Sequence, residues 1–300
     1  MNTLAIPDLE GQTVLVTGAT SGIGLEAAVM LARAGASTVI VGRNPAKTES
    51  VLADIKRRAN PDTVEPMLCD FASQTDIRRF AAEFLARYSR LDVLINNAGG
   101  VHSRRTLTED GIETTFAVNH LGYFLLTNLL LERLMASVPA RIVNVASHLH
   151  YKGTLDFDDL GFENDYTILR AYARSKLANV LFTRLLARRL EGTGVTVNAV
   201  HPGTVASHIW DGAPRWTRPF FALTKRFFMI KPFQGAQRIV YLATSPEVKN
   251  ANGLYFEDNR AQTPSEKSRD DALAEKLWQE SERLTTRSSR QHEQGRHSPS

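Results

Sequence analysis

The chain has 300 residues, of which 43% are hydrophobic and 23% are charged, an ordinary globular composition for one large α/β domain or two small ones. The net charge is +4, and the last sixteen residues hold three Arg and one Glu, so the remainder is close to neutral and gives no argument for nucleic-acid binding. One cysteine, Cys69, excludes an internal disulfide, and we see neither a secretory leader nor an apolar run of about 18 residues, so we expect a reducing, cytoplasmic location without a membrane span.

The first predicted element leads into a phosphate-binding turn. Thr13–Thr17 is a β-branched, apolar run, and Gly18, Gly22 and Gly24 follow it as G-x-x-x-G-x-G before a helical pattern over Leu25–Ala34. Glycines let the backbone approach a ligand closely, and the free N–H groups and positive dipole end of a helix N-terminus face an anion. A plain strand-to-helix turn seldom needs three glycines at this spacing, so we expect a dinucleotide site.

The second predicted strand, Ser37–Val41, carries the signal for cofactor choice. It runs into Gly42-Arg43-Asn44, with one arginine and no acid. A site for NAD tends to have Asp or Glu here, whereas an arginine binds a ribose 2′-phosphate that a carboxylate would repel. We therefore predict a preference for NADP(H), with NAD(H) as the alternative cofactor. The competing interpretation is that Arg43 is a solvated loop residue.

Strands and helices then alternate, which predicts right-handed βαβ units, a parallel sheet and a ligand site beyond the carboxyl ends of its strands. The predicted elements are a helix over Ala46–Ala59, a strand over Val64–Leu68, a helix over Thr75–Arg87 and a strand over Leu91–Ile95. Asp70, after the third strand, is either the cap of the next helix or an adenine contact. The fourth strand ends in Asn96-Asn97-Ala98-Gly99.

Two polar residues follow in the next pair of elements. Glu113–Ser137 is a long apolar helix, buried or at a subunit contact, and Asn119 inside it either bonds locally or belongs to the site. The fifth strand, Arg141–Ser147, brings Ser147 to the same edge of the sheet. His148 and His150 come next, and because no third ligand is apparent we interpret them as pocket walls and predict no metal site.

The helical run Tyr166–Leu190 contains Tyr172 and Lys176, which are four residues apart and share one helix face. A tyrosine hydroxyl has a pKa near ~10, and a neighbouring ammonium stabilises the phenolate and lowers that pKa. The same spacing also occurs by chance on solvated helix faces. The pair gains weight because the glycine turn, Asn119 and Ser147 are predicted at the same edge of the sheet.

The remaining chain completes one domain, residues 1–284. A sixth strand, Val195–Val200, ends in His201-Pro202-Gly203, and the aromatic and basic segment 204–231 is a candidate lid over an apolar substrate, with peripheral membrane contact or plain packing as alternatives. The last elements are a helix over Phe233–Thr244, a strand over Gly253–Phe256 and a helix over Asp270–Leu284. Residues 285–300 are polar, and we expect them to be disordered.

Together these motifs resemble the short-chain dehydrogenase/reductase family over roughly residues 10–284. The matches are Thr17–Gly24 as TGxxxGxG, Asn96–Gly99 as NNAG, Asn119, Ser147, Tyr172-x-x-x-Lys176 and Pro202-Gly203. Further features resemble the retinol dehydrogenase-like branch, namely Phe157–Leu160, the 25 residues from Ser147 to Tyr172, the aromatic segment after Gly203, and Lys276-Leu277-Trp278. The resemblance implies an α/β fold with a single Rossmann-type, doubly wound parallel sheet of about seven strands and helices on both faces.

The resemblance also implies a role for each catalytic candidate. Tyr172 protonates the carbonyl oxygen during reduction, and Lys176 lowers the pKa of Tyr172 and bonds the nicotinamide ribose. Ser147 hydrogen-bonds the substrate oxygen, and Asn119 holds a water in a proton relay to Lys176. The implied cofactor-binding residues are Gly18, Thr20, Ser21, Gly22, Ile23, Gly24, Arg43, Asn44, Asp70, Phe71, Asn97, Ala98, Gly99, Tyr172, Lys176, Pro202, Gly203, Val205 and Ser207. Ser207 stands where the family often has Thr, and it keeps the hydroxyl that would contact the nicotinamide carboxamide.

These expectations describe an NADP(H)-dependent oxidoreductase that interconverts a carbonyl and an alcohol on a bulky apolar small molecule. Two alternatives stay open, a catalytically silent NADP(H)-binding sensor or scaffold, and the same chemistry on a polar, polyketide or steroid ketone. Because relatives often pair across a two-fold, we expect a homodimer formed through the helices at 113–137 and 166–190.

Overall fold

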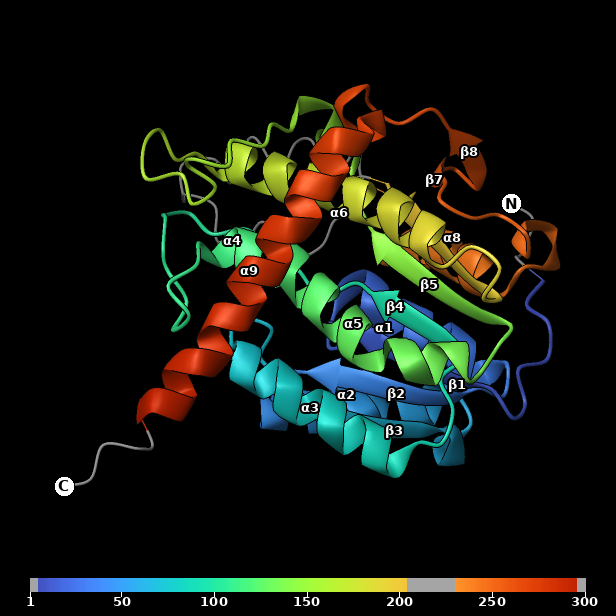
Figure 1. Ribbon diagram of the computed structural model, residues 1–300. Helices are drawn as coiled ribbons and strands as arrows, with labels where there is room; N and C mark the ends of the chain where they lie inside the picture. The colour runs from blue at the N-terminus through green and yellow to red at the C-terminus, as the bar shows by residue number, and fades with distance from the viewer. Residues whose placement is uncertain (1–4, 204–229, 296–300) are drawn as a thin grey trace, which may run out of the picture.

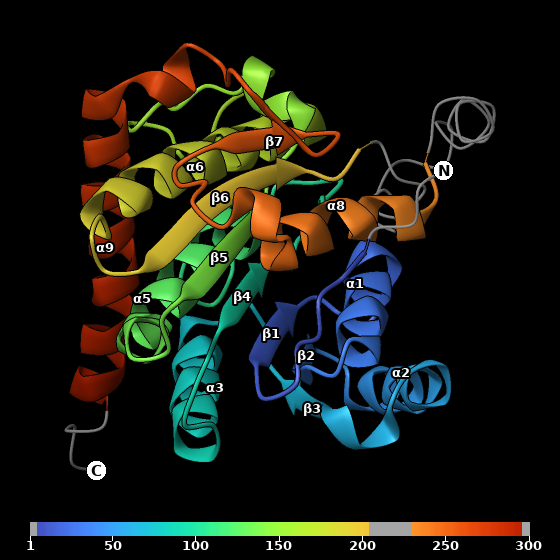
Figure 2. The ribbon, with the colours of Figure 1, turned by 90° about the vertical axis from the view of Figure 1, so that its right-hand side faces the viewer.

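The computed structural model describes residues 5–203 and 230–295. Within them, eight strands form one sheet in the order β3-β2-β1-β4-β5-β6-β7-β8 (Figures 1 and 2). The strands are β1 (Thr13–Thr17), β2 (Ser37–Gly42), β3 (Val64–Leu68), β4 (Val93–Asn96), β5 (Ala140–Val145), β6 (Val195–His201), β7 (Tyr255–Glu257) and β8 (Arg260–Gln262). Strands β1 to β7 are parallel, and their order reverses between β1 and β4. This order confirms the predicted doubly wound sheet, whose ligand site belongs at that reversal.

Helices cover both faces of the sheet (Figures 1 and 2). On one face lie α1 (Gly22–Arg33), α2 (Pro45–Arg58) and α8 (Pro232–Thr244), and on the other α3 (Gln74–Arg87), α5 (Gly122–Met135) and α6 (Ile168–Arg189). The terminal helix α9 (Asp271–Gly295) crosses the outside of α6, α5 and α3. A short α4 (Thr114–Phe116) lies near the start of α6.

The central strands β1 and β4 are apolar on both sides because both faces of the sheet are covered. Along β1, Leu15 belongs to the core under α3, α5 and α6, whereas Val14 and Val16 belong to the core under α1 and α8. Leu94 and Ile95 of β4 divide in the same way. The seven predicted strands are all present, with ends within two residues of those expected.

The eighth strand is a feature that the sequence interpretation missed. Strand β8 pairs antiparallel with β7 at the edge of the sheet, through a turn at Asp258 and Asn259 with φ values of 48° and 60°. Asp and Asn tolerate this left-handed backbone better than other side chains do, and two-residue turns of this kind connect the strands of β-hairpins. The short, exposed strand after the turn has no hydrophobic alternation that would identify it.

The long helix expected over Glu113–Ser137 is interrupted. After α4, residues Ala117–Leu121 form a π-helical turn, and α5 begins at Gly122. The buried carboxylate of Glu113 caps the start by accepting hydrogen bonds from the N–H groups of Thr115 and Phe116. Single π-helical turns are rare and often occur at functional sites, and this one contains Asn119.

The terminal helix extends further than expected. It passes Leu284 and continues to Gly295, into the segment for which we expected disorder, and residues 296–300 lie outside the described residues. Trp278 packs against Phe124 of α5 and Phe182 of α6, with ring centroids 5.0 and 5.8 Å apart. Because α9 covers these sides of α5 and α6, they are not available for the pairing that we expected through the two helices.

Two expectations concern the membrane and the lid. Most of the candidate lid, residues 204–229, lies outside the described residues. Among the helices that the structure does describe, none has the length and apolar character to cross a bilayer.

Candidate active site

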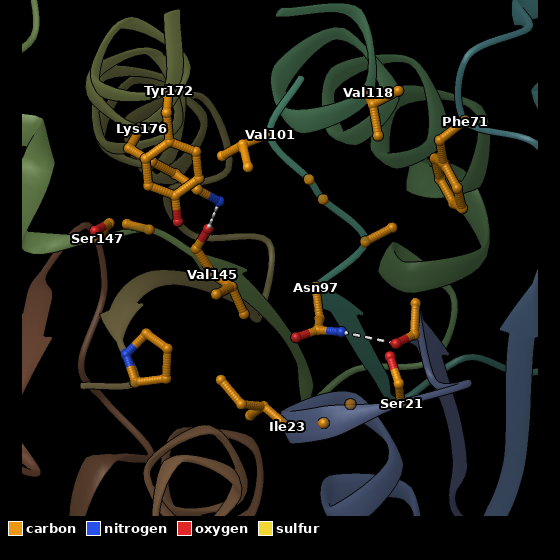
Figure 3. A pocket seen from close by; sticks show the side chains of 18 of the residues that line it. Ser21, Ile23, Phe71, Asn97, Val101, Val118, Val145, Ser147, Tyr172 and Lys176 are labelled. Atoms are coloured by element: carbon orange, nitrogen blue, oxygen red, sulfur yellow. Dashed lines mark hydrogen bonds between the residues drawn. The ribbon is translucent and has the colours of Figure 1, made fainter. Parts of the chain in front are cut away.

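A pocket with a volume of about 680 Å³ lies at the carboxyl ends of strands β1 to β6. This volume falls in the range of about 300–1,000 Å³ that is typical of ligand sites. Its lining joins segments that are far apart in the sequence (Figure 3). The predicted site residues that line it are Gly18, Thr20, Ser21, Gly22, Ile23, Gly24, Arg43, Asp70, Phe71, Asn97, Ala98, Gly99, Ser147, Tyr172, Lys176, Pro202 and Gly203.

The glycine turn is packed too tightly for side chains. Gly18 and Gly22 have φ values of 66° and 58°, and a Cβ on Gly24 would lie 2.5 Å from both the Asn97 amide nitrogen and the Gly18 carbonyl oxygen. Asn97 Nδ2 donates to the carbonyl of Thr17 at 2.8 Å and to that of Gly18 at 3.2 Å, which fixes the turn against β4; Figure 3 shows the bond to Gly18. The turn therefore leaves backbone N–H groups exposed at the start of α1, as a pyrophosphate site requires.

Thr17 is a structural member of this site that the sequence interpretation did not single out. Its hydroxyl accepts hydrogen bonds from the N–H groups of Asn97 and Ala98, at 2.8 and 3.0 Å, and donates to the carbonyl of Ile95. It therefore joins the ends of β1 and β4. Its position as the first residue of the TGxxxGxG match was the available signal.

At the end of the pocket formed by β2 and β3, Arg43 and Asp70 face each other. Arg43 Nη1 lies 3.9 Å from Asp70 Oδ1, and both side chains are largely exposed, so the pair contributes little to stability. Asp70 is not the cap of α3, because Ser73 holds that position and accepts from the N–H of Asp76. Asn44 caps α2 by accepting from the N–H of Lys47 and is not among the lining residues.

The side chains of Ser147 and Tyr172 line the same part of the pocket. Ser147 Oγ accepts from the N–H of Leu149 at 3.2 Å, so its proton is free to point toward Tyr172. Burial raises the pKa of Tyr172 to about 12, and the hydrogen bond with Ser147 acts in the opposite direction. In Figure 3 both side chains point into the pocket. A substrate oxygen held between these two hydroxyls would have one proton donor and one hydrogen-bond donor.

Lys176 lies one helical turn beyond Tyr172 and is buried. Its ammonium donates to the carbonyl of Val145 at 2.8 Å, which is the end of β5 (Figure 3). Burial lowers the pKa of Lys176 to about 7. The expected lowering of the Tyr172 pKa is not what the geometry gives, because the desolvation of the phenol outweighs the other contributions.

Asn119 does not line the pocket but holds its wall. Its Oδ1 accepts from the N–H of Gly100 at 2.9 Å, and its Nδ2 donates to the carbonyl of Gly100 and to Ser175 Oγ at 3.0 and 3.1 Å. Ser175 in turn donates to the carbonyl of Tyr172. Asn119 thus links the chain after β4 to α6, and its role in a water-mediated relay stays a prediction.

The two predicted histidines differ in position. His148 lines the pocket, and its Nδ1 lies 3.0 Å from Glu257 Oε1. His150 is buried behind Ser147, donates from Nδ1 to the carbonyl of Ser147 and accepts at Nε2 from the N–H of Ser265. A third histidine, His201, also lines the pocket, and burial lowers its pKa to about 4. The predicted contacts Val205 and Ser207 lie outside the described residues.

The described residues fit a nicotinamide dinucleotide. The glycine turn would hold the phosphates, because even one added Cβ would collide there, and Arg43 would face an additional phosphate at the end of β2. Tyr172, Ser147 and Lys176 lie together in the same pocket, beside Pro202 and Gly203.

Comparison with known proteins agrees with this geometry. The sequence model described as short chain dehydrogenase matches residues 12–217. The chain is 46% identical over 286 residues to Retinol dehydrogenase 14 of Mus musculus, covering 91% of this chain and 86% of that protein.

Solved structures are similar as well. A crystal structure of an uncharacterized protein from Mycobacterium Paratuberculosis is 32% identical, with a TM-score of 0.75 and coverage of 94% of this chain and 96% of that one. The RhlG/NADP active-site complex of Pseudomonas aeruginosa is 25% identical, with a TM-score of 0.67 and coverage of 83% and 95%. The chain therefore belongs to the short-chain dehydrogenase family, resembles its retinol dehydrogenases, and is an oxidoreductase acting on CH–OH groups.

Proposed function

We propose that the protein is an NADP(H)-dependent enzyme that interconverts a carbonyl and an alcohol on a bulky apolar substrate, with Tyr172 as acid and base. The observation that carries this proposal is that Tyr172, Ser147 and Lys176 line the same pocket as the glycine turn. Two hydroxyls that line one pocket can both reach one substrate oxygen.

In the direction of reduction, the bound nicotinamide supplies the hydride to the carbonyl carbon. Tyr172 gives its phenolic proton to the carbonyl oxygen, and Ser147 donates a hydrogen bond to the same oxygen as negative charge develops on it. Lys176 keeps an ammonium near the phenol, with its ring centroid 5.5 Å from Nζ, and favours the phenolate that remains. The reverse reaction uses the same groups in opposite protonation states.

The proposed cofactor preference rests on Arg43. It lines the pocket beyond β2, where a 2′-phosphate on the adenosine ribose would lie. An NAD-preferring site would have Asp or Glu at this position instead of arginine. The RhlG complex, which contains NADP, supports the same preference by similarity. The Asp70 carboxylate lies 3.9 Å from the Arg43 guanidinium and would compete with a bound 2′-phosphate for it.

Two observations bear on the substrate. The mouse relative is named a retinol dehydrogenase, and Val101, Val118 and Leu149 give the pocket apolar walls, which favours a retinoid-like or other lipid-like carbonyl. The imidazoles of His148 and His201 line the same pocket, which favours a carbonyl compound that also carries a polar group.

Homodimer formation stays part of the proposal, through a surface other than the one that α9 covers.

The test is an NADPH-oxidation screen over aldehydes and ketones graded by chain length, ring size and polarity, together with alcohols and NADP⁺ in the reverse direction. We expect turnover that rises with apolar size, and a second series with a hydroxyl or carboxylate distinguishes the polar alternative. Tight NADPH binding without turnover of any compound in either direction would refute the proposal.

A further inference from the structure

A chain of buried polar groups connects the terminal helix to the catalytic lysine. His120, in the π-helical turn, is fully buried, with its Nδ1 3.2 Å from Asn179 Oδ1 on α6 and its Nε2 3.1 Å from Ser281 Oγ on α9. The rings of Phe116, Phe124 and Phe182 lie around the imidazole. Figure 1 shows α9 crossing α6 and α5. Neither the proposed chemistry nor the cofactor site uses this histidine.

The direction of the Asn179 amide is fixed by what surrounds it. Its Nδ2 lies 2.9 Å from the carbonyl oxygen of Asn119 and 3.5 Å from that of Val145. Carbonyl oxygens only accept hydrogen bonds, so the NH₂ group must face them, and Oδ1 must face His120. His120 Nδ1 therefore carries a proton and donates it to Asn179.

The other ring nitrogen follows from this. Burial lowers the pKa of His120 to about 4, so the imidazole is neutral at pH 7 and its Nε2 is an acceptor. The Ser281 hydroxyl donates to the carbonyl of Leu277 at 2.7 Å and lies 3.1 Å from Nε2, so its single proton can be shared between these two acceptors. From His120 onward the hydrogen bonds run in one direction, through Asn179 toward the carbonyl groups beside Lys176.

We propose that Asn179 is a positioning residue for Lys176, and that His120 and Ser281 hold its amide in the required direction. The carbonyl of Val145, which Asn179 approaches, is also the acceptor for the Lys176 ammonium at 2.8 Å. An inverted amide would present Oδ1 to two carbonyl oxygens, and the repulsion would displace the Val145 carbonyl and the ammonium with it. This inference rests on the proposed role of Lys176 in the reaction.

Two substitutions of His120 distinguish its hydrogen bond to Asn179 from its contact with Ser281. In His120→Asn the amide nitrogen takes the place of Nδ1 and can still donate to Asn179, whereas in His120→Gln it takes the place of Nε2 and reaches only Ser281. We expect His120→Gln to lower kcat by about tenfold or more, because small misplacements of a reacting group are costly. His120→Asn should stay within about threefold of the wild type, with a similar loss of thermal stability in both variants. Equal kcat values for the two variants would overturn the proposal.

A pH profile supplies a readout that a purely structural role would not change. Among the described residues, the titratable groups facing the ammonium are the phenols of Tyr172 on α6 and Tyr123 on α5, with ring centroids 5.5 and 5.7 Å from Nζ. Asn179→Asp adds a carboxylate, which favours the charged lysine and should move the alkaline fall of kcat to higher pH. Asn179→Leu adds no charge and should lower kcat without that displacement. An unmoved profile in Asn179→Asp, at full kcat, contradicts the proposal.

A third pair of variants covers the case in which the His120 variants do not fold. Ser281→Ala removes the hydroxyl that contacts His120 Nε2, whereas Thr285→Ala removes a buried hydroxyl one turn along α9 that bonds only to backbone carbonyls. We expect kcat to fall in Ser281→Ala and not in Thr285→Ala, with Ser281→Thr restoring it. Equal kcat values for Ser281→Ala and Thr285→Ala would contradict the proposed connection from Ser281 through His120 to Asn179.

The same data set distinguishes failure of this inference from failure of the proposed function. Loss of activity in Tyr172→Phe and Lys176→Met, together with full activity in Asn179→Leu and His120→Gln, refutes the positioning chain alone. Full activity in Tyr172→Phe removes the proposed function, and the positioning of Lys176 with it.

Discussion

The guanidinium of Arg43 lies 3.9 Å from the carboxylate of Asp70, across the end of the pocket formed by β2 and β3. Both side chains are accessible, at 72% and 40%, so a bound anion can reach the arginine without breaking a buried ion pair. Neighbouring strand ends bring the two residues together although 27 positions separate them in the chain. This relationship gives the cofactor preference a direct test.

We predict that the wild-type protein has a higher kcat/KM with NADPH than with NADH. Arg43→Asp should lower the NADPH value by about tenfold or more, since hydrogen bonds to charged groups contribute roughly 1.5–3 kcal/mol. The value for NADH should change little, because that cofactor carries no 2′-phosphate. The measurement is the ratio of the two kcat/KM values for both proteins, and a wild-type ratio below one refutes the preference.

The buried lysine predicts a pH dependence of stability. Because burial lowers the pKa of Lys176 to about 7, the unfolded chain binds more protons than the folded one between pH 7 and about 10.4. The ammonium therefore costs stability below pH 7, and that cost disappears as the pH rises through this window. Lys176→Met should raise the free energy of unfolding by roughly 1–4 kcal/mol at pH 6 and by much less at pH 10.

Urea unfolding at pH 6, 8 and 10 measures this difference. Lys249→Met, at an exposed position, controls for the change of side chain. A difference between Lys176→Met and the wild type that stays constant over this pH range would mean that Lys176 is not desolvated.

The glycine turn should tolerate no side chain at Gly24. An alanine Cβ would lie 2.5 Å from Asn97 Nδ2 and from the Gly18 carbonyl oxygen, one of which belongs to the rigid backbone. Gly24→Ala should lower stability by about 1–3 kcal/mol and NADPH affinity by at least about tenfold. Gly100→Ala, where a Cβ meets nothing within 4 Å, is the matched change for stability. Calorimetric titration with NADPH that gives the wild-type affinity for Gly24→Ala would exclude this turn as the phosphate site.

The terminal helix should be an integral part of the domain. Trp278 is buried between Phe124 and Phe182, and the guanidinium of Arg189 stacks on its ring with 3.9 Å between Cζ and the ring centroid. Trp278→Ala should cost about 3–5 kcal/mol of unfolding free energy, whereas Gln279→Ala on the exposed side of the helix should cost little. Similar denaturation midpoints for the two variants would mean that α9 is not docked as described.

The sequence predicted the sheet well because its signals are local. Buried β-branched runs such as Ser37–Val41 and the glycines after β1 are visible in the sequence, and the alternation of strands and helices predicts parallel pairing. Ser147 and Tyr172 line one pocket because Ser147 follows the carboxyl end of β5 and Tyr172 lies on α6 at the same edge of the sheet. The proximity of these two residues depends on the sheet topology, which the alternation of strands and helices already predicts.

Other parts of the site depend on contacts that sequence patterns do not reveal. The π-helical turn at Ala117–Leu121 has no compositional signal, and the helix pattern of Glu113–Ser137 continues through it. The Val145 carbonyl that accepts from Lys176 is backbone, and His120 has partners 59 and 161 residues away in the chain. The raised pKa of Tyr172 follows from burial, which a spacing of four residues does not measure.

The most direct test of the account is the Tyr172→Phe variant, with NADPH and the best carbonyl substrate from the screen. We predict that kcat falls by about 10²-fold or more, because the proton donor is lost, while the dissociation constant for NADPH stays within about threefold of the wild type. A variant that retains the wild-type kcat would contradict the central claim that the phenol of Tyr172 transfers the proton.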